Sequence, residues 1–164
     1  MPIPTHLPRS RRVISAGGVV LRESSKGLEV LCITLKQGRV RSLPKGRVEA
    51  KERYAETALR EVREETGIEA EVLAPLGKIR YYFTVHEPEG PSPVTKEVHY
   101  FLMRYRSGHP KPQLTEVEAV GWLPAQEALE RLSYKNEREM LHKALEIFAH
   151  LKATSPSPGE EALP

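Results

Sequence analysis

Hydrophobic residues along the chain form runs typical of strands in some stretches and stripes typical of helices in others. The segments Val13 to Leu21 and Leu28 to Leu35 are rich in Val, Ile and Leu, and the polar stretch between them predicts a hairpin-type loop. Further runs of the same kind predict strands at residues 79–85, 97–106 and 117–123. The segment 87–93 contains three prolines, which predicts a loop.

Helical periodicity appears in three other stretches. In the segment 54–66 one face of a helix carries Ala55, Ala58, Leu59, Val62 and Thr66, and Gly67 follows as a stop signal. Pro124 opens a second helix at 125–132, and a third is expected at 136–151. Strands interleaved with helices predict an α/β/α sandwich with a mixed β-sheet between helices.

The length of 164 residues predicts one folded domain. We place it at residues 13–152, between a proline-rich and basic N-terminal arm at 1–12 and a Ser/Pro-rich tail at 153–164, neither of which has an apolar period. No apolar run approaches the ~18 residues that a membrane span needs. A single cysteine, Cys32, lies in an apolar run and predicts a reducing, cytoplasmic setting. The net charge of +3 does not by itself indicate nucleic-acid binding.

Three carboxylates gather on the first predicted helix. Glu61, Glu64 and Glu65 are spaced i, i+3 and i+4, so they fall on one arc away from the apolar stripe. Oxygen ligands of this kind suit Mg²⁺ or Mn²⁺. The spacing alone favours a solvated acidic face that pairs with Arg60 and Arg63.

A basic stretch precedes this helix. Between residues 36 and 47 there are five cations and no acid, and Leu43-Pro44-Lys45-Gly46 predicts a rigid turn just before the acidic segment. Cations and metal-held carboxylates together suit a pyrophosphate, whose oxygens they neutralise while a carboxylate orients the attacking water. The basic stretch alone is also typical of a solvated loop or a nucleic-acid patch.

The whole segment from Gly46 to Ile68 resembles the Nudix box, G-x5-E-x7-R-E-U-x-E-E-x-G-U, where U is a bulky aliphatic residue. Every fixed position is filled, by Gly46, Glu52 and the run from Arg60 to Ile68. The stretches 16–20, 43–46 and 121–124 are similar to segments usual in this family. Ala50-Lys51 departs from the Pro-Gly that many members carry before the box glutamate, a change confined to the loop.

The resemblance implies a metal site. Glu61, Glu64 and Glu65 are expected to bind divalent metals, with a backbone carbonyl near Lys45 or Gly46 as a further ligand. Arg60 is expected to pair with Glu52 and so to hold the loop against the helix rather than to touch substrate.

Two carboxylates are candidates for the general base. Family members use either a glutamate of the box or one from a distant loop. Glu64 is the first candidate here, and Glu116, in the loop before the 117–123 strand, is the second.

The resemblance also implies hydrolysis of a nucleoside diphosphate linked to another group, which the box does not identify. The chain is similar to diadenosine polyphosphate hydrolases, and also to a triphosphate-cleaning branch and to diphosphoinositol polyphosphate enzymes. Candidate substrate contacts are the cations Lys45, Arg47, Arg41 and Lys96, the aromatic residues Tyr82 and Tyr134, and His99. We expect a dinucleoside polyphosphate that is cut asymmetrically to release ATP.

Other interpretations fit the same residues. Tyr82 and Tyr134 are also typical of core packing, and His99 of a packed strand histidine. A protein that binds RNA or phosphate without catalysis could use the basic stretch, but it would have no need of three glutamates. No obligatory nucleic-acid partner is expected. The oligomeric state is expected to be a monomer or a homodimer.

Overall fold

The computed structural model describes residues 11–112 and 117–154. Its elements, in chain order, are β1 (Arg11–Ser24), β2 (Gly27–Leu35), β3 (Val40–Ser42), β4 (Lys45–Arg47), α1 (Tyr54–Thr66), β5 (Glu69–Glu87), β6 (Gly90–Ser107), β7 (Ala119–Pro124), α2 (Ala125–Arg131) and α3 (Lys135–Thr154). No helix in these ranges is long and apolar enough to cross a membrane.

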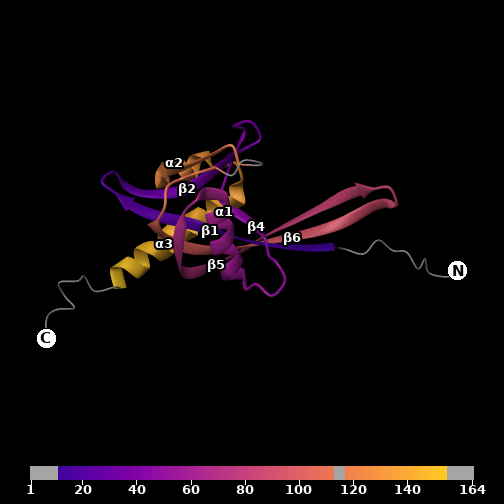
Figure 1. Cartoon of the computed structure of the whole chain (residues 1–164), viewed down its shortest axis with the longest axis horizontal. Helices are drawn as coiled ribbons and strands as arrows, with labels where there is room; N and C mark the ends of the chain where they lie inside the picture. The colour runs from indigo at the N-terminus through magenta and orange to yellow at the C-terminus, as the bar shows by residue number, and fades with distance from the viewer. Residues whose placement is uncertain (1–10, 113–116, 155–164) are drawn as a thin grey trace.

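The strands form one mixed sheet between helical layers, as the sequence predicts. The order is β3-β2-β1-β6-β5, with β4 on β1 and β7 on β2, and only the β1–β6 pair is parallel. Helix α1 packs on one face of the sheet, where Ala58 and Val62 meet Ala16, Val20 and Met103. Helices α2 and α3 cover the other face (Figure 1), where Leu141 and Phe148 belong to the larger core cluster.

Strand β1 changes partner along its length, and this opens the centre of the sheet. It pairs with β2 between Leu21 and Ser24 and with β4 between Ser15 and Gly17. The short β4 therefore fills the place beside β1 that β2 leaves. Position 17 is glycine because any side chain there would overlap the carbonyl of Pro44, so the two strands approach closely.

The helix α1 is where the pattern placed it. It spans Tyr54–Thr66, and Gly67 ends it in the left-handed conformation with φ of 77°. The other predicted helices differ only at their ends, since α2 stops at Arg131 and α3 runs from Lys135 to Thr154.

Two expectations about the strands were wrong. Strand β5 begins at Glu69 rather than 79, and its first half is irregular, with register shifts beside Pro75 and Gly77 that hide its period. The predicted loop 87–93 is a tight turn, because β6 already begins at Gly90. Pro91 and Pro93 lie at the start of β6, opposite His86 and Thr84 of β5.

The predicted domain limits also shift slightly. Arg11 and Arg12, placed in the arm, belong to β1 and form ion pairs with Glu87 and Glu97. Helix α3 extends two residues into the predicted tail. The outer halves of β5 and β6 project from the domain as a two-stranded ribbon, with the start of β1 beside its root (Figure 1).

Candidate active site

An ion pair joins the loop before α1 to the helix. Nε and Nη2 of Arg60 donate to the two carboxylate oxygens of Glu52 at 2.7 and 3.0 Å. Glu52 also accepts from the hydroxyl of Thr57 and from the backbone N–H of Glu49, while Arg60 Nη2 donates to the carbonyl of Arg47. Hydrogen bonding to Arg60 is the main reason that the pKa of Glu52 falls to about 2. The pair therefore fixes β4 and the loop against the helix.

Glu61 and Glu65 lie one turn apart on α1 and face β4. Glu61 accepts a 2.8 Å hydrogen bond from Arg60, and a side chain at position 46 would overlap its carboxylate, so Gly46 provides the space that it occupies. Glu65 is only 8% exposed and forms no ion pair within the described ranges. Burial, together with the adjacent Glu61, raises the pKa of Glu65 to about 8, although Lys45 opposes the shift. Burial is also the main reason that the pKa of Glu61 is raised.

Glu64 is the most exposed of the three glutamates. Its side chain is 46% exposed and accepts a 3.1 Å hydrogen bond from Arg60. Among the described residues no three His, Cys, Asp or Glu side chains form a group that could hold a metal ion, so the ligand set of Glu61, Glu64 and Glu65 stays a prediction. Nη1 of Arg60 donates to both Glu61 and Glu64.

The Glu61–Glu65 pair nevertheless fits a divalent metal. The buried carboxyl group of Glu65 and the largely covered one of Glu61 lie beside a strand whose glycine leaves room for Glu61, and Glu65 forms no ion pair in the described structure. Hard oxygen donors in that setting suit Mg²⁺ or Mn²⁺. A bound cation would favour the ionised form of both groups and so oppose the burial that raises their pKa values.

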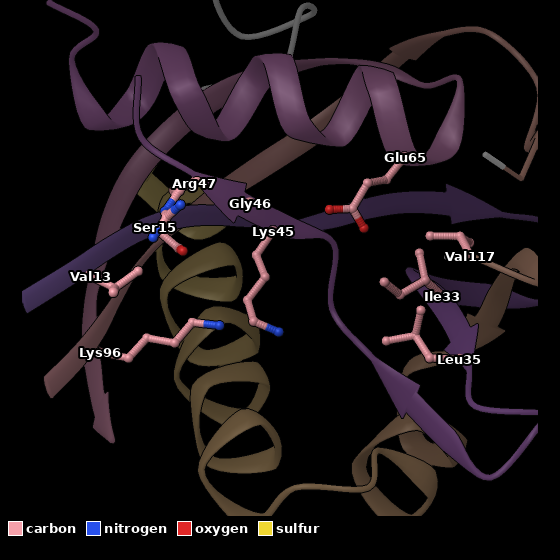
Figure 2. A pocket seen from close by; sticks show the side chains of 10 residues that line it. All are labelled: Val13, Ser15, Ile33, Leu35, Lys45, Gly46, Arg47, Glu65, Lys96 and Val117. Atoms are coloured by element: carbon pink, nitrogen blue, oxygen red, sulfur yellow. The ribbon is translucent and has the colours of Figure 1, made fainter. Parts of the chain in front are cut away.

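A cavity of about 400 Å³ opens beside Glu65 at the place where β1 and β2 diverge. Figure 2 shows the side chains that line it: Val13 and Ser15 of β1, Ile33 and Leu35 of β2, Lys45, Gly46 and Arg47 of β4, and Glu65, Lys96 and Val117. The cavity has a carboxylate on the helix side, an apolar wall and a group of cations.

The cations Lys45, Arg47 and Lys96 share this cavity. None of the three has an ion-pair partner within 4.0 Å in residues 11–112 and 117–154. Burial, followed by the charges of Lys45 and Arg47, lowers the pKa of Lys96. Mutual repulsion of this kind disappears when an anion binds among the three groups.

The loop that carries Lys45 is held from the opposite side of the sheet by Glu137. This α3 carboxylate is fully buried and accepts hydrogen bonds from the N–H of Leu43 at 2.7 Å and from the hydroxyl of Ser42 at 2.8 Å. The sequence reasoning missed it. The sequence does contain a feature that marks this residue: Glu137 lies on the apolar stripe of α3, which Leu141, Ala144 and Phe148 continue at helical spacing.

Four expected substrate contacts lie outside the cavity. Arg41 is on β3, where its backbone bonds to Ser133. His99 stacks on Tyr54 with ring centroids 4.3 Å apart, on the α1 side of the sheet. Tyr82 is 72% exposed on the ribbon, and Tyr134 is partly exposed between α2 and α3. Tyr82 faces away from Lys96 because its neighbour Tyr81 is the residue paired with Lys96.

Glu116, the alternative general base, lies outside the described residues.

Comparison with known proteins identifies one family. The family model described as "NUDIX domain" matches residues 11–144. The chain is 41% identical over 116 residues to the MutT4 protein of Mycobacterium tuberculosis, covering 71% of this chain and 45% of that one. It is 31% identical over 145 residues to an 8-oxo-(d)GTP phosphatase of Mycolicibacterium smegmatis, covering 82% and 42%. It therefore spans less than half the length of these two relatives.

A mouse relative is shorter. The asymmetrical bis(5'-nucleosyl)-tetraphosphatase of Mus musculus is 35% identical over 111 residues, which cover 67% of this chain and 73% of the mouse protein. Among solved structures, the binary complex of a C. elegans Ap4A hydrolase has a TM-score of 0.64 at 21% identity, covering 84% and 98% of the two chains. The NUDIX domain of Shewanella oneidensis NrtR, solved with ADP ribose, has a TM-score of 0.62 at 18% identity, covering 85% and 90%. These structural likenesses support the fold.

Proposed function

The chain belongs to the Nudix family, and on that premise we propose that it is a pyrophosphohydrolase that acts on dinucleoside polyphosphates. One observation carries the proposal: Lys45, Arg47 and Lys96, without ion-pair partners in the described structure, share a cavity with the buried carboxylate of Glu65. Cations that surround one space favour a ligand with several negative charges.

Hydrolases of this family require divalent metal ions. Here Glu61 and Glu65 would hold the metal, with Glu64 and a carbonyl of the Lys45-Gly46 segment as further oxygen donors. When bound, the metal neutralises phosphoryl oxygens and lowers the pKa of a water molecule. Mg²⁺ and Mn²⁺ both suit these ligands.

The remaining roles belong to the chain itself. Lys45, Arg47 and Lys96 bind and orient the phosphate chain. Glu64 is proposed as the general base, because it is the box glutamate that keeps solvent access, and Glu116 is the alternative. Arg60 and Glu52 position the carboxylates without contacting substrate.

The number of cations in the cavity favours a long phosphate chain. A short diphosphate would leave part of the cation group unpaired, whereas a chain of four or more phosphates can meet all three. The activity in the name of the mouse relative, an asymmetrical tetraphosphatase, supports this substrate class. ATP is then the expected product.

A second candidate is hydrolysis of oxidised nucleoside triphosphates. It is favoured by the 31% identity to a protein named as an 8-oxo-(d)GTP phosphatase. We expect a single compartment for both activities, the cytoplasm.

A substrate panel separates the candidates. The kcat/KM of the protein in Mg²⁺ is measured for diadenosine tetraphosphate, 8-oxo-dGTP, dGTP, ADP-ribose and a diphosphoinositol polyphosphate. The proposal predicts the highest value for diadenosine tetraphosphate. A higher value for 8-oxo-dGTP supports the second candidate, and no hydrolysis of any substrate contradicts both.

A further inference from the structure

A second cavity, of about 520 Å³, lies at the root of the β5–β6 ribbon. Its lining comes from β5 and β6 of the ribbon, from the start of β1 and from β4: Arg11, Arg12, Val13, Arg47, Phe83, Val85, Glu87 and Val94. Val13 and Arg47 also line the first cavity, so the two spaces adjoin. Each has the size of a typical small-molecule site, ~300 to 1,000 Å³.

The strand register places the second cavity in line with the cations of the first. Val13 of β1 pairs with Lys96 of β6, and Lys96 pairs with Tyr81 of β5. Two residues further along the ribbon, Val94 pairs with Phe83. Since side chains two residues apart share a face of a strand, Phe83 and Val94 continue the face that presents Lys96. Tyr82 belongs to the opposite face.

An aromatic ring and cations meet in this second cavity. Phe83 is 45% exposed, so a large apolar surface is open to solvent in a cavity wall, with Val85 and Val94 beside it. Arg11 and Arg12 pair with Glu87 and Glu97, yet both side chains remain more than half exposed. Arg47, at the junction with the first cavity, has no ion-pair partner in the described structure.

The first cavity has its own apolar end. Figure 2 shows Ile33, Leu35 and Val117 on one side of the Lys45 side chain, and Val13, Arg47 and Lys96 on the other. The second cavity continues from Val13 and Arg47. The adjoining cavities thus run from an apolar wall, past the cations, to Phe83.

We propose that the second cavity binds the second nucleoside of a dinucleoside polyphosphate, with its base stacked on Phe83 and the phosphate chain crossing Arg47 and Lys96. Two bases joined by a polyanion match a surface that is apolar at both ends and cationic between them. A base–aromatic stack contributes ~1 to 3 kcal/mol in other proteins. This inference takes its substrate class from the proposed function. It adds that Phe83 of the ribbon contacts that substrate.

The test compares two ligands with the same number of phosphates, of which one has the second nucleoside and the other has a free terminal phosphate with an additional negative charge. Dissociation constants are measured by calorimetry in Mg²⁺ for adenosine tetraphosphate and diadenosine tetraphosphate, each as a methylene-bridged analogue that is not hydrolysed. The KM values of the natural compounds are measured in parallel. Phe83→Ala is the variant, and Tyr82→Ala is the matched control, because it removes the adjacent and more exposed aromatic ring from the opposite face of the ribbon.

We expect Phe83→Ala to weaken binding of the diadenosine ligand about tenfold and to change binding of adenosine tetraphosphate less than about twofold. Tyr82→Ala should alter neither. Equal effects of the two variants, or equal effects of Phe83→Ala on the two ligands, would overturn the inference. The two proposals are separable, because absence of hydrolysis contradicts the proposed function while the binding preference still decides whether Phe83 holds the second nucleoside.

Discussion

The carboxylate of Glu137 on α3 accepts a 2.7 Å hydrogen bond from the backbone N–H of Leu43, 94 residues earlier in the chain. Leu43 begins the short segment that continues through Pro44 into Lys45 and Gly46. The carbonyl of Pro44 in turn accepts from the N–H of Gly18 in β1. A buried charge on the far helix thus fixes the backbone on which the cavity's central cation is placed.

Replacing Glu137 by alanine is expected to destabilise the fold and disturb the site. The change leaves the N–H of Leu43 and the hydroxyl of Ser42 without this acceptor, which costs about 2 to 4 kcal/mol. Glu137→Gln should cost less, because its amide oxygen still accepts. Urea denaturation measures the free energy of unfolding. Glu139→Ala, on the exposed side of the same helix, is the control, and an equal loss in both alanine variants would contradict the assigned role.

Arg60→Lys is expected to lower both the stability of the fold and the kcat. Lysine keeps the charge but cannot make the two-pronged contact to Glu52 and also reach the carbonyl of Arg47. We expect a loss of about 1 to 3 kcal/mol in unfolding free energy, and a lower kcat, because β4 is no longer held to α1. A double-mutant cycle with Glu52→Gln should give a coupling energy of the same order. Arg63→Lys, whose guanidinium is half exposed, is the control that should change little.

The part of the site that is formed by residues close together in the chain could be predicted from the sequence. Helix α1 and its end at Gly67 follow from spacing within 14 residues, and the Arg60–Glu52 pair spans eight. The exposure of Glu64 could not be predicted, because helical spacing places it near Glu61 and Glu65 but does not show how deeply each side chain is buried.

The rest of the site depends on contacts between distant segments. Lys96 reaches Lys45 only because β1 pairs in parallel with β6 and antiparallel with β4. The face to which each aromatic residue of β5 belongs could not be predicted for a related reason. Adjacent positions in a strand face opposite sides, and only the register shows that Tyr81 and Phe83, not Tyr82, share the face of Lys96.

Glu65 should make the metal-free protein less stable as the pH rises. Its pKa in the fold is about 8, whereas the ordinary value is 4.5. The folded state therefore keeps a proton that the unfolded chain releases, so this contribution is complete below pH 4.5 and is lost as the pH rises through about 8. In chelator, the melting temperature of the wild type should fall from about pH 5 to about pH 8.5, and Glu65→Gln should reduce that fall. Identical pH profiles for the two proteins would argue against a buried, protonated Glu65.

Lys96→Ala is expected to act on long phosphate chains in particular. Loss of one charge-assisted hydrogen bond should weaken the binding of a dinucleoside tetraphosphate by about 1.5 to 3 kcal/mol, and the binding of ADP-ribose by less. The measurement is KM for both substrates. Lys26→Ala, in the exposed turn between β1 and β2, is the control for a simple loss of positive charge. The same change in KM for both substrates would show that Lys96 does not sense chain length.

Metal held by Glu61 and Glu65 is proposed to support asymmetric cleavage of a dinucleoside polyphosphate. This is tested by separating the products of diadenosine tetraphosphate by ion-exchange chromatography, with Mg²⁺, for the wild type and for Glu65→Gln. We expect ATP and AMP in equal amounts from the wild type, no products in excess chelator, and a turnover lower by orders of magnitude for the folded Glu65→Gln variant. Two molecules of ADP, or full turnover in chelator, would contradict this proposal.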